Sequence, residues 1–397
     1  MRFKSTYLLT ILLFFVFFSC KSSHKDTQKT VVKTEIKAKI LPGAYQFDAY
    51  LPYLKGKNVA IVGNQTSEVA GTHLVDTLRA LHINIVKVFA PEHGFRGQAS
   101  AGEQVADAKD IKTGLPIISL YGKHKKPTPE DLADVDVVVF DIQDVGARFY
   151  TYLSTLHYVM EAVAENHKQM LVLDRPNPNA DYIDGPVMEP EFTSFVGLHP
   201  VPIVYAMTIG EYARMINGEH WLKNGVSADM RVIKIKHYKH GDVYRLPVKP
   251  SPNLPNYQAV RLYPSLCLFE GTHISVGRGT DFQFQVYGAP DLPKTDFSFI
   301  PHPNAGSKWP MHQNKQCYGK DLRKATPPTQ IYLGWLIEAY QNYTKKEAFF
   351  NKFFVKLAGT QQLQKDIENG LPAKEIKAKW QKGIEQFKQV RRKYLLY

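Results

Sequence analysis

Short apolar runs recur between residues 57 and 173, and each is followed by a polar loop. They cover residues 58–62, 83–89, 116–120, 135–142 and 170–173 and are rich in Val, Ile and Leu. Runs of this length with many β-branched residues are typical of strands buried on both faces of a parallel sheet. Because helical patterns lie between them, the sequence predicts an α/β fold with a Rossmann-like, doubly wound parallel sheet.

The predicted helices have apolar faces or recognisable starts. Apolar residues at helical spacing predict helices over residues 73–81 and 152–163. Thr128 and Thr208 are each followed three positions later by an acidic residue, which predicts a capping box at the start of two further helices. Another strand is expected over residues 230–235.

The length of the chain and one irregular stretch suggest two domains. At 397 residues the chain exceeds what one ordinary core accommodates. Residues 247–264 are rich in Pro and Asn and separate the regular α/β pattern from a less regular remainder. We therefore expect a Rossmann-like catalytic domain over residues 41–262. A smaller α/β domain over residues 263–397 is expected to complete a cleft.

The first 40 residues do not share this pattern. A basic start is followed by an apolar stretch, residues 7–18, that is too short to span a bilayer and ends at Ser19-Cys20. This segment resembles a bacterial lipoprotein signal, in which the cysteine is lipidated; an uncleaved anchor or an ordinary signal peptide is the alternative. Residues 1–20 are the expected signal peptide and residues 21–40, which are polar and Lys-rich, a flexible tether. Lipidated Cys20 would hold the protein at the periplasmic side of a membrane, for which we expect the outer membrane.

Composition and missing motifs narrow the choice of ligand. The formal net charge is +13, which favours anionic partners such as acidic glycans, lipid head groups or nucleic acid. No Gly-x-Gly-x-x-Gly follows the first apolar run, and no Gly-x-x-x-x-Gly-Lys-Ser/Thr occurs anywhere. A Gly-x-Ser-x-Gly elbow is also missing. The sheet is therefore expected to bind neither a nucleotide nor an acyl substrate, and no cofactor is predicted.

Polar residues follow the predicted strands, where α/β sheets bind ligands. The candidates in these loops are Asn64, Glu92, His93, Arg96, Asp141, Gln143, Asp144, Arg148, Asp174, Arg175 and Asn177. Carboxylates among amides and arginines describe a sugar site better than a transition-metal site, which favours clustered histidines. Later in the chain, Glu270 follows another apolar run, and Arg278 stands between two glycines, where it suits a carboxylate or a phosphate. Asp281 lies beside this loop and is a further candidate.

Four segments carry a resemblance to a known family. They are residues 88–97 (VFAPEHGFRG), 140–152 (FDIQDVGARFYTY), 173–178 (LDRPNP), and 269–272 (FEGT) together with 277–280 (GRGT). These segments resemble the exo-β-N-acetylmuramidase (NamZ-like) family, and the likeness runs over nearly the whole chain after the tether. It implies a Rossmann-like domain without nucleotide, a smaller α/β domain, and a site in the cleft between them. The implied reaction is release of N-acetylmuramic acid from the non-reducing ends of peptidoglycan fragments. The glutamate proposed as catalytic in the family falls on Glu92.

The candidate residues agree with this chemistry. Glycoside hydrolysis commonly needs one protonated carboxyl group, which assists the leaving oxygen, and one ionised carboxyl group. Glu92 is the expected acid. The candidates for the ionised partner are Asp141, Asp144 and Glu270. Those for binding the lactyl carboxylate of muramic acid are Arg278, Arg148 and Arg96, of which Arg278 is the one we expect. The expected partners are peptidoglycan-derived sugars and a membrane, with no nucleotide and no nucleic acid.

Two other functions fit the same residues. A metal-dependent hydrolase would use His93, Asp141 and Asp144, although no metal site is predicted. A non-catalytic lipoprotein would hold muramyl sugars without turning them over. Cys267 and Cys317 could pair in an oxidising compartment, but their spacing does not demand it.

Overall fold

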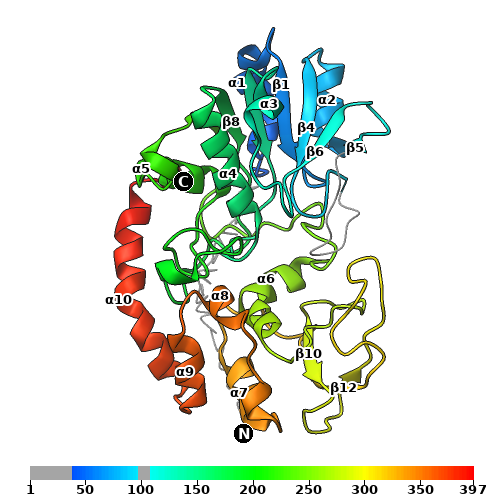
Figure 1. Ribbon diagram of the computed structural model, residues 1–397, viewed down its shortest axis with the longest axis vertical. Coiled ribbons are helices and arrows are strands. Elements are labelled where there is room, and N and C mark those ends of the chain that lie inside the picture. Colours follow the sequence, from blue (N-terminus) through cyan, green and yellow to red (C-terminus); the bar gives the residue numbers. More distant parts are fainter. Residues whose placement is uncertain (1–37, 97–107) are drawn as a thin grey trace, which may run out of the picture. The chain divides into compact units, whose positions relative to one another are not determined.

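The computed structural model describes residues 38–96 and 108–397, and its largest sheet has seven strands, several of which are labelled in the upper part of Figure 1. Its strands are β5 (Ala108–Lys109), β6 (Pro116–Ser119), β4 (Ile85–Ala90), β1 (Val59–Gly63), β7 (Val137–Asp141), β8 (Gln169–Leu173) and β9 (Asp229–Ile233), in spatial order. Neighbouring strands are parallel except β5 and β6. From β1 the chain moves outward through β4 and β6, then returns to pair β7 with β1 and continues to the other side. This is the doubly wound topology that the sequence predicts.

Both faces of the sheet are covered, as continuous apolar strands require. The helices that take part are α1 (Phe47–Leu54), α2 (Leu74–Ala80), α3 (Pro129–Leu132), α4 (Tyr152–Glu165) and α5 (Ile209–Gly218). Side chains alternate along a strand, so Val59 and Ile61 join one core with residues of α1 and α2, whereas Ala60 and Val62 join another with residues of α4 and α5. Every residue of β1 and β7 is buried.

Local signals placed several element ends correctly. The capping boxes at Thr128 and Thr208 are both formed, with the threonine hydroxyl accepting the backbone N–H of Asp131 and Glu211 respectively. Helix α5 ends at Gly218. Strands β2 (Glu68–Val69) and β3 (Thr72–His73), which the sequence did not predict, form a short hairpin before α2.

The proline-rich stretch contains a helix that its composition conceals. Helix α6 (Tyr257–Leu266) starts where the Asn256 side chain accepts the backbone N–H of Ala259 at 3.0 Å, and Pro264 lies in its last turn. A 3₁₀ turn, Cys267–Gly271, follows directly. The apolar run before Glu270 is therefore helical, so Glu270 does not follow a strand as Glu92 does. Val260, Leu262 and Leu266 have the spacing of a helix, but the prolines around them favoured a loop in the sequence analysis.

The rest of the chain forms a small sheet and a set of helices. The elements are β10 (Val286–Ala289), β11 (Ser298–Phe299), β12 (Cys317–Asp321), α7 (Gly334–Asn342), α8 (Phe354–Ala358), α9 (Gln362–Glu368) and α10 (Ala373–Arg392). Helix α10 brings the C-terminus back beside α5 (Figure 1), where Arg214 donates to the Tyr394 carbonyl at 2.8 Å. The larger core includes residues on both sides of residue 262, so the expected domain boundary stays a prediction. Within the described residues, no helix is long and apolar enough to cross a membrane.

Candidate active site

The polar residues at the ends of β1, β7 and β8 are buried and hydrogen-bonded within the protein. Asp141 and Arg175 form the centre of this group: the Arg175 Nε and Nη2 atoms donate to the two carboxylate oxygens at 2.6 and 2.8 Å. The exposed fraction is 0% for Asp141 and 3% for Arg175. We call the buried residues Asn64, Asp141, Gln143, Asp144, Asp174, Arg175 and Asn177 the strand-end cluster. They fill the edge where a doubly wound sheet would otherwise hold a ligand.

Further members of the strand-end cluster bind the backbone or other buried side chains. Gln143 donates to the carbonyls of Asp144 and Pro176. Asp174 accepts the hydroxyls of Thr208 and Tyr397, both at 2.7 Å. Burial raises the pKa of Asp174 to about 7. These bonds tie the loops after β7 and β8 to neighbouring segments.

Asp144 and Asn177 complete the cluster. Asp144 accepts the backbone N–H of Gly146 at 2.7 Å and the hydroxyl of Tyr205, and burial raises its pKa to about 6. Its Oδ1 atom is buried with no hydrogen-bond partner among residues 38–96 and 108–397. The Asn177 amide donates to the Met207 carbonyl at 2.8 Å. Both side chains therefore face the interior.

Three other predicted site residues, Arg148, Arg96 and Asp281, do not line the pocket that Glu92 lines. Arg148 is buried and donates to the carbonyls of Pro186, Val201, Leu357 and Ala358, so it ties segments on both sides of residue 262. Burial lowers its pKa to about 9. Arg96 binds Asp110 through two hydrogen bonds of 3.1 and 2.8 Å. Asp281 is exposed.

A pocket of about 460 Å³ lies next to the strand-end cluster. Its walls come from the loops after β4, β6 and β7, from residues 195–196 and 251–254, and from α6 and the turns that follow it. We call it the glutamate pocket, because Glu92 and Glu270 both line it. Its aromatic lining residues are Tyr121, Phe149, Tyr150, Tyr152, Phe195, Tyr263, Phe284 and Phe353. Of the fourteen site residues that the sequence suggested, the pocket brings together four, which are Glu92, His93, Glu270 and Arg278.

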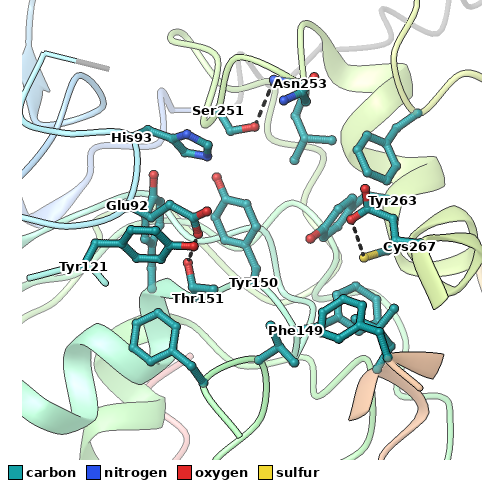
Figure 2. A pocket seen from close by; sticks show the side chains of 18 of the residues that line it. Glu92, His93, Tyr121, Phe149, Tyr150, Thr151, Ser251, Asn253, Tyr263 and Cys267 are labelled. Carbon is teal, nitrogen blue, oxygen red and sulfur yellow. Dashed lines mark hydrogen bonds between the residues drawn. The ribbon is translucent and has the colours of Figure 1, made fainter. Parts of the chain in front are cut away.

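Glu92 stands on a tight turn at the end of β4 and is held by hydroxyl groups. Thr151 donates to its carboxylate at 2.7 Å, and the hydroxyl of Tyr121 also hydrogen-bonds to it. Figure 2 shows the three side chains next to one another. Burial, followed by the negative charge of Glu92, raises the pKa of Tyr121. The next residue, His93, has a φ of 72° in the left-handed region, which costs a non-glycine residue about 1–3 kcal/mol. Such strain is found at functional sites, where it holds a side chain in place.

Glu270 comes from another wall and pairs with Arg278. The Arg278 Nε and Nη2 atoms both donate to its carboxylate, and the bond from Nη2 measures 3.0 Å. The guanidinium also lies 5.0 Å from the centre of the Phe284 ring. Burial lowers the pKa of Arg278, but the negative charge of Glu270 outweighs it, so the pKa lies above its ordinary value. The pocket thus contains one carboxylate bound by hydroxyls and one bound by a cation.

The floor of the pocket connects it to the strand-end cluster. Asn64 donates to the Tyr152 hydroxyl at 2.8 Å, and the hydroxyls of Tyr150 and Tyr152 reach the Pro250 carbonyl. The proline-rich stretch therefore forms one wall through Ser251 and Asn253 (Figure 2). In this way the cluster supports the pocket without lining it.

Several pocket residues were not among the predicted site residues. Tyr150, Thr151 and Tyr152 lie in the segment that carried the family resemblance, so that segment was the available signal. Phe195 and Lys125 lie in segments without any recognisable pattern. Cys267 lines the pocket, and both Cys267 and Cys317 are buried and unpaired.

The proposed metal ligands are not brought together. Both carboxylate oxygens of Asp141 bind Arg175, and His93 lines the pocket while Asp141 does not. In the part of the chain that the structure describes, no group of three or more His, Cys, Asp or Glu side chains could hold a metal ion. His93, Asp141 and Asp144 are therefore not arranged as a ligand set.

The fold and the pocket define an α/β protein with a carbohydrate-type site, in which two glutamates stand among aromatic rings. The chain belongs to the exo-β-N-acetylmuramidase NamZ family: the N-terminal model of that family matches residues 59–258, and the C-terminal model matches residues 261–397. This membership makes the protein a glycoside hydrolase.

Similar proteins support the assignment. The chain is 40% identical over 379 residues to the peptidoglycan β-N-acetylmuramidase NamZ of Bacillus subtilis (strain 168), covering 88% of this chain and 89% of that protein. A crystal structure of a DUF1343 family protein from Bacteroides fragilis superposes with a TM-score of 0.85 at 45% identity, covering 91% of this chain and 99% of the other. A second DUF1343 family protein of that species gives 0.76 at 29% identity, covering 90% and 99%.

Proposed function

We propose that the protein is an exo-acting β-N-acetylmuramidase that releases N-acetylmuramic acid from the non-reducing ends of peptidoglycan fragments during cell-wall turnover. The observation that carries the proposal is the glutamate pocket, in which Glu92 and Glu270 come from separate walls. Two carboxyl groups that flank one sugar are what most glycoside hydrolases use. Family membership supplies the substrate class.

Glu92 is the general acid in this proposal. It follows a buried strand at the ligand-binding edge of the sheet, and two hydroxyl groups hold its carboxyl group in the pocket. Protonation of the glycosidic oxygen by Glu92 would allow the sugar to leave.

Glu270 is the second carboxyl group. Of the three candidates for the ionised partner, it lines the pocket, whereas Asp141 and Asp144 belong to the buried strand-end cluster. Its ion pair with Arg278 suits a group that acts as a carboxylate, either beside the oxocarbenium-like transition state or as a base or nucleophile.

Glu92→Gln tests the assignment of the acid. The amide keeps the shape of the side chain but cannot transfer the proton, so kcat on a muramyl-sugar substrate should fall roughly a hundredfold to ten-thousandfold. On an activated aryl muramide the loss should be small, because that group leaves without protonation. Glu270→Gln should instead slow both substrates, and Asp281→Asn, at an exposed position, is the control. If Glu92→Gln slows both substrates equally while it stays folded, Glu92 is the base or nucleophile.

The same assay tests the other two functions. A sugar-binding lipoprotein would bind the aryl muramide without releasing the aryl group. A metal-dependent hydrolase would lose activity in EDTA, whereas the proposed mechanism predicts full activity there.

Location is a separate part of the proposal. We expect lipidation of Cys20, which lies outside the described residues, and attachment to the periplasmic side of the outer membrane. The short apolar stretch before Cys20 supports this. Cys20→Ser should move the protein from the membrane fraction to the soluble fraction. Wild-type protein that is already soluble would contradict the proposal.

A further inference from the structure

Two long cationic side chains line the glutamate pocket, and their surroundings differ. Arg278 is held by Glu270 through two of its nitrogen atoms. Lys125 stands in the loop between β6 and α3, and its Nζ atom lies 4.9 Å from the centre of the Phe195 ring. Within residues 38–96 and 108–397, Lys125 makes no ion pair with a carboxylate. The positive charge at this wall is therefore not compensated by a neighbouring acid.

The adjacent lysine, Lys126, differs from Lys125 because it has acidic partners. Lys126 binds Glu161 and Glu165, both at 2.6 Å, and so it is already paired on the side of the loop that faces α4. Lys125 instead lies against the Phe195 ring, and both residues line the pocket. A cation over an aromatic face is stabilised modestly and keeps its capacity to bind an anion.

Lys125 belongs to the same wall as the proposed acid. The Phe195 ring packs edge-on against Tyr121, with ring centres 5.9 Å apart, and Tyr121 hydrogen-bonds to Glu92. A sugar whose glycosidic oxygen lies at Glu92 therefore has aromatic rings and a cation along one side. Glu270 and Arg278 come from the 267–278 segment on a different part of the lining.

We infer that Lys125 binds the lactyl carboxylate of the muramyl residue and so makes the pocket selective for muramic acid over glucosamine. This inference rests on the proposed function and adds the residue that recognises its substrate. The two N-acetylated sugars differ by the lactyl group, whose carboxylate is the one charge on the muramyl ring. An ammonium group without an acidic partner is suited to that charge.

Of the three arginines expected from the sequence to bind this carboxylate, two are bound outside the glutamate pocket, and the third, Arg278, pairs with Glu270 within it. Arg148 donates to four backbone carbonyls and is buried, and Arg96 pairs with Asp110. Arg278 lines the pocket, and its Nη1 atom has no hydrogen-bond partner among residues 38–96 and 108–397. Its charge is already neutralised by Glu270, however, so a substrate carboxylate there would place two anionic groups on one guanidinium. The structure therefore favours the lysine.

The test removes the charge from the protein and from the ligand in turn. The substrates are an aryl muramide with a free lactyl carboxylate and the same compound with that group converted to the primary amide. The wild-type enzyme should prefer the acid by about tenfold to a hundredfold in kcat/KM, as expected for a hydrogen-bonded charge. Lys125→Met should remove that preference by lowering kcat/KM on the acid to about the value on the amide. Lys125→Arg should restore part of it.

Lys123→Met is the matched control. Lys123 is exposed in the same loop and does not line the pocket, so this variant should keep the wild-type preference. The inference is overturned if Lys125→Met keeps the preference for the acid, or if Arg278→Met removes it while Lys125→Met does not. If wild-type protein turns over neither compound, the proposed function itself has failed.

Discussion

The strand-end cluster and the glutamate pocket lie side by side at the carboxyl edge of the sheet, and both contain acidic and basic side chains. In the cluster, Asp141 and Arg175 satisfy each other in the interior. In the pocket, Glu92 is held by hydroxyl groups, and Lys125 has no acidic partner in the described chain. A polar side chain whose hydrogen bonds and ion pairs are all made within the protein interior stabilises the fold. A polar side chain that lines the pocket can also bind or react with a ligand.

The cluster occupies the place at which doubly wound sheets usually bind a ligand. β1 and β7 are the strands between which the direction of winding reverses, and ligands usually bind there. The side chains of Asn64 and Asp141 occupy that place, and Asn64 reaches the Tyr152 hydroxyl under the pocket. The glutamate pocket therefore lies beside this place, between the loops that follow β4 and β6 and residues 251–284.

The largest effect on stability is expected from Asp141→Asn. This change removes the charge that compensates buried Arg175, and breaking such a pair costs about 3–5 kcal/mol in the free energy of unfolding. Urea unfolding at pH 7 would measure it, and Asp281→Asn at an exposed site should change stability by less than about 0.5 kcal/mol. Folded Asp141→Asn protein should retain catalysis. A lost kcat in protein of undiminished stability would instead place Asp141 in the chemistry.

A pH-dependent effect is expected from Asp144. Burial raises its folded-state pKa from 3.8 to about 6, so the protein binds this proton more tightly than the unfolded chain. The stabilisation is complete below pH 3.8 and is lost as pH rises through 6. Its full size is on the order of 3 kcal/mol. The Asn side chain of Asp144→Asn stays neutral at every pH. The free energy of unfolding of this variant should therefore rise relative to that of wild type between pH 4 and 7, and the difference should stay constant above pH 7.

Unfolding curves of both proteins at several pH values would check this prediction. Asp174, whose pKa burial raises to about 7, contributes with the same sign in both proteins and cancels in the difference. A difference that stays constant from pH 4 to pH 8 would contradict the assignment of the shift to Asp144.

The smallest effect is expected in the pocket, from Thr151→Val. The change removes one hydroxyl donor to Glu92 and should lower kcat about tenfold with little change in stability, because Tyr121 still holds the carboxyl group. Steady-state kinetics on a muramyl-sugar substrate would measure it. Thr151→Ser keeps the donor and should restore the rate; a variant that behaves like Thr151→Val would point to packing of the methyl group instead.

Local sequence patterns predicted the six parallel strands of the large sheet, two capping boxes and the place of Glu92 at the end of β4, but not the edge strand β5. These features depend on local patterns: a buried strand needs a continuous apolar run, and a capping box needs two residues three positions apart. Family resemblance also pointed to Glu270 and Arg278. Helix α6 was missed because prolines around it outweighed the Asn256 cap.

Only the tertiary structure decided which polar residues face a ligand. A charged side chain in a strand-end loop looks the same in sequence whether its partner is the substrate or the protein. The partner of Asp141 lies 34 residues away, and Arg148 binds the Leu357 carbonyl across 209 residues. Lys125 and Lys126 are neighbours in sequence, yet one lines the pocket and the other is bound by Glu161 and Glu165. Since desolvation and pairing depend on such distant contacts, local pattern could place these residues at the edge of the sheet but could not assign their roles.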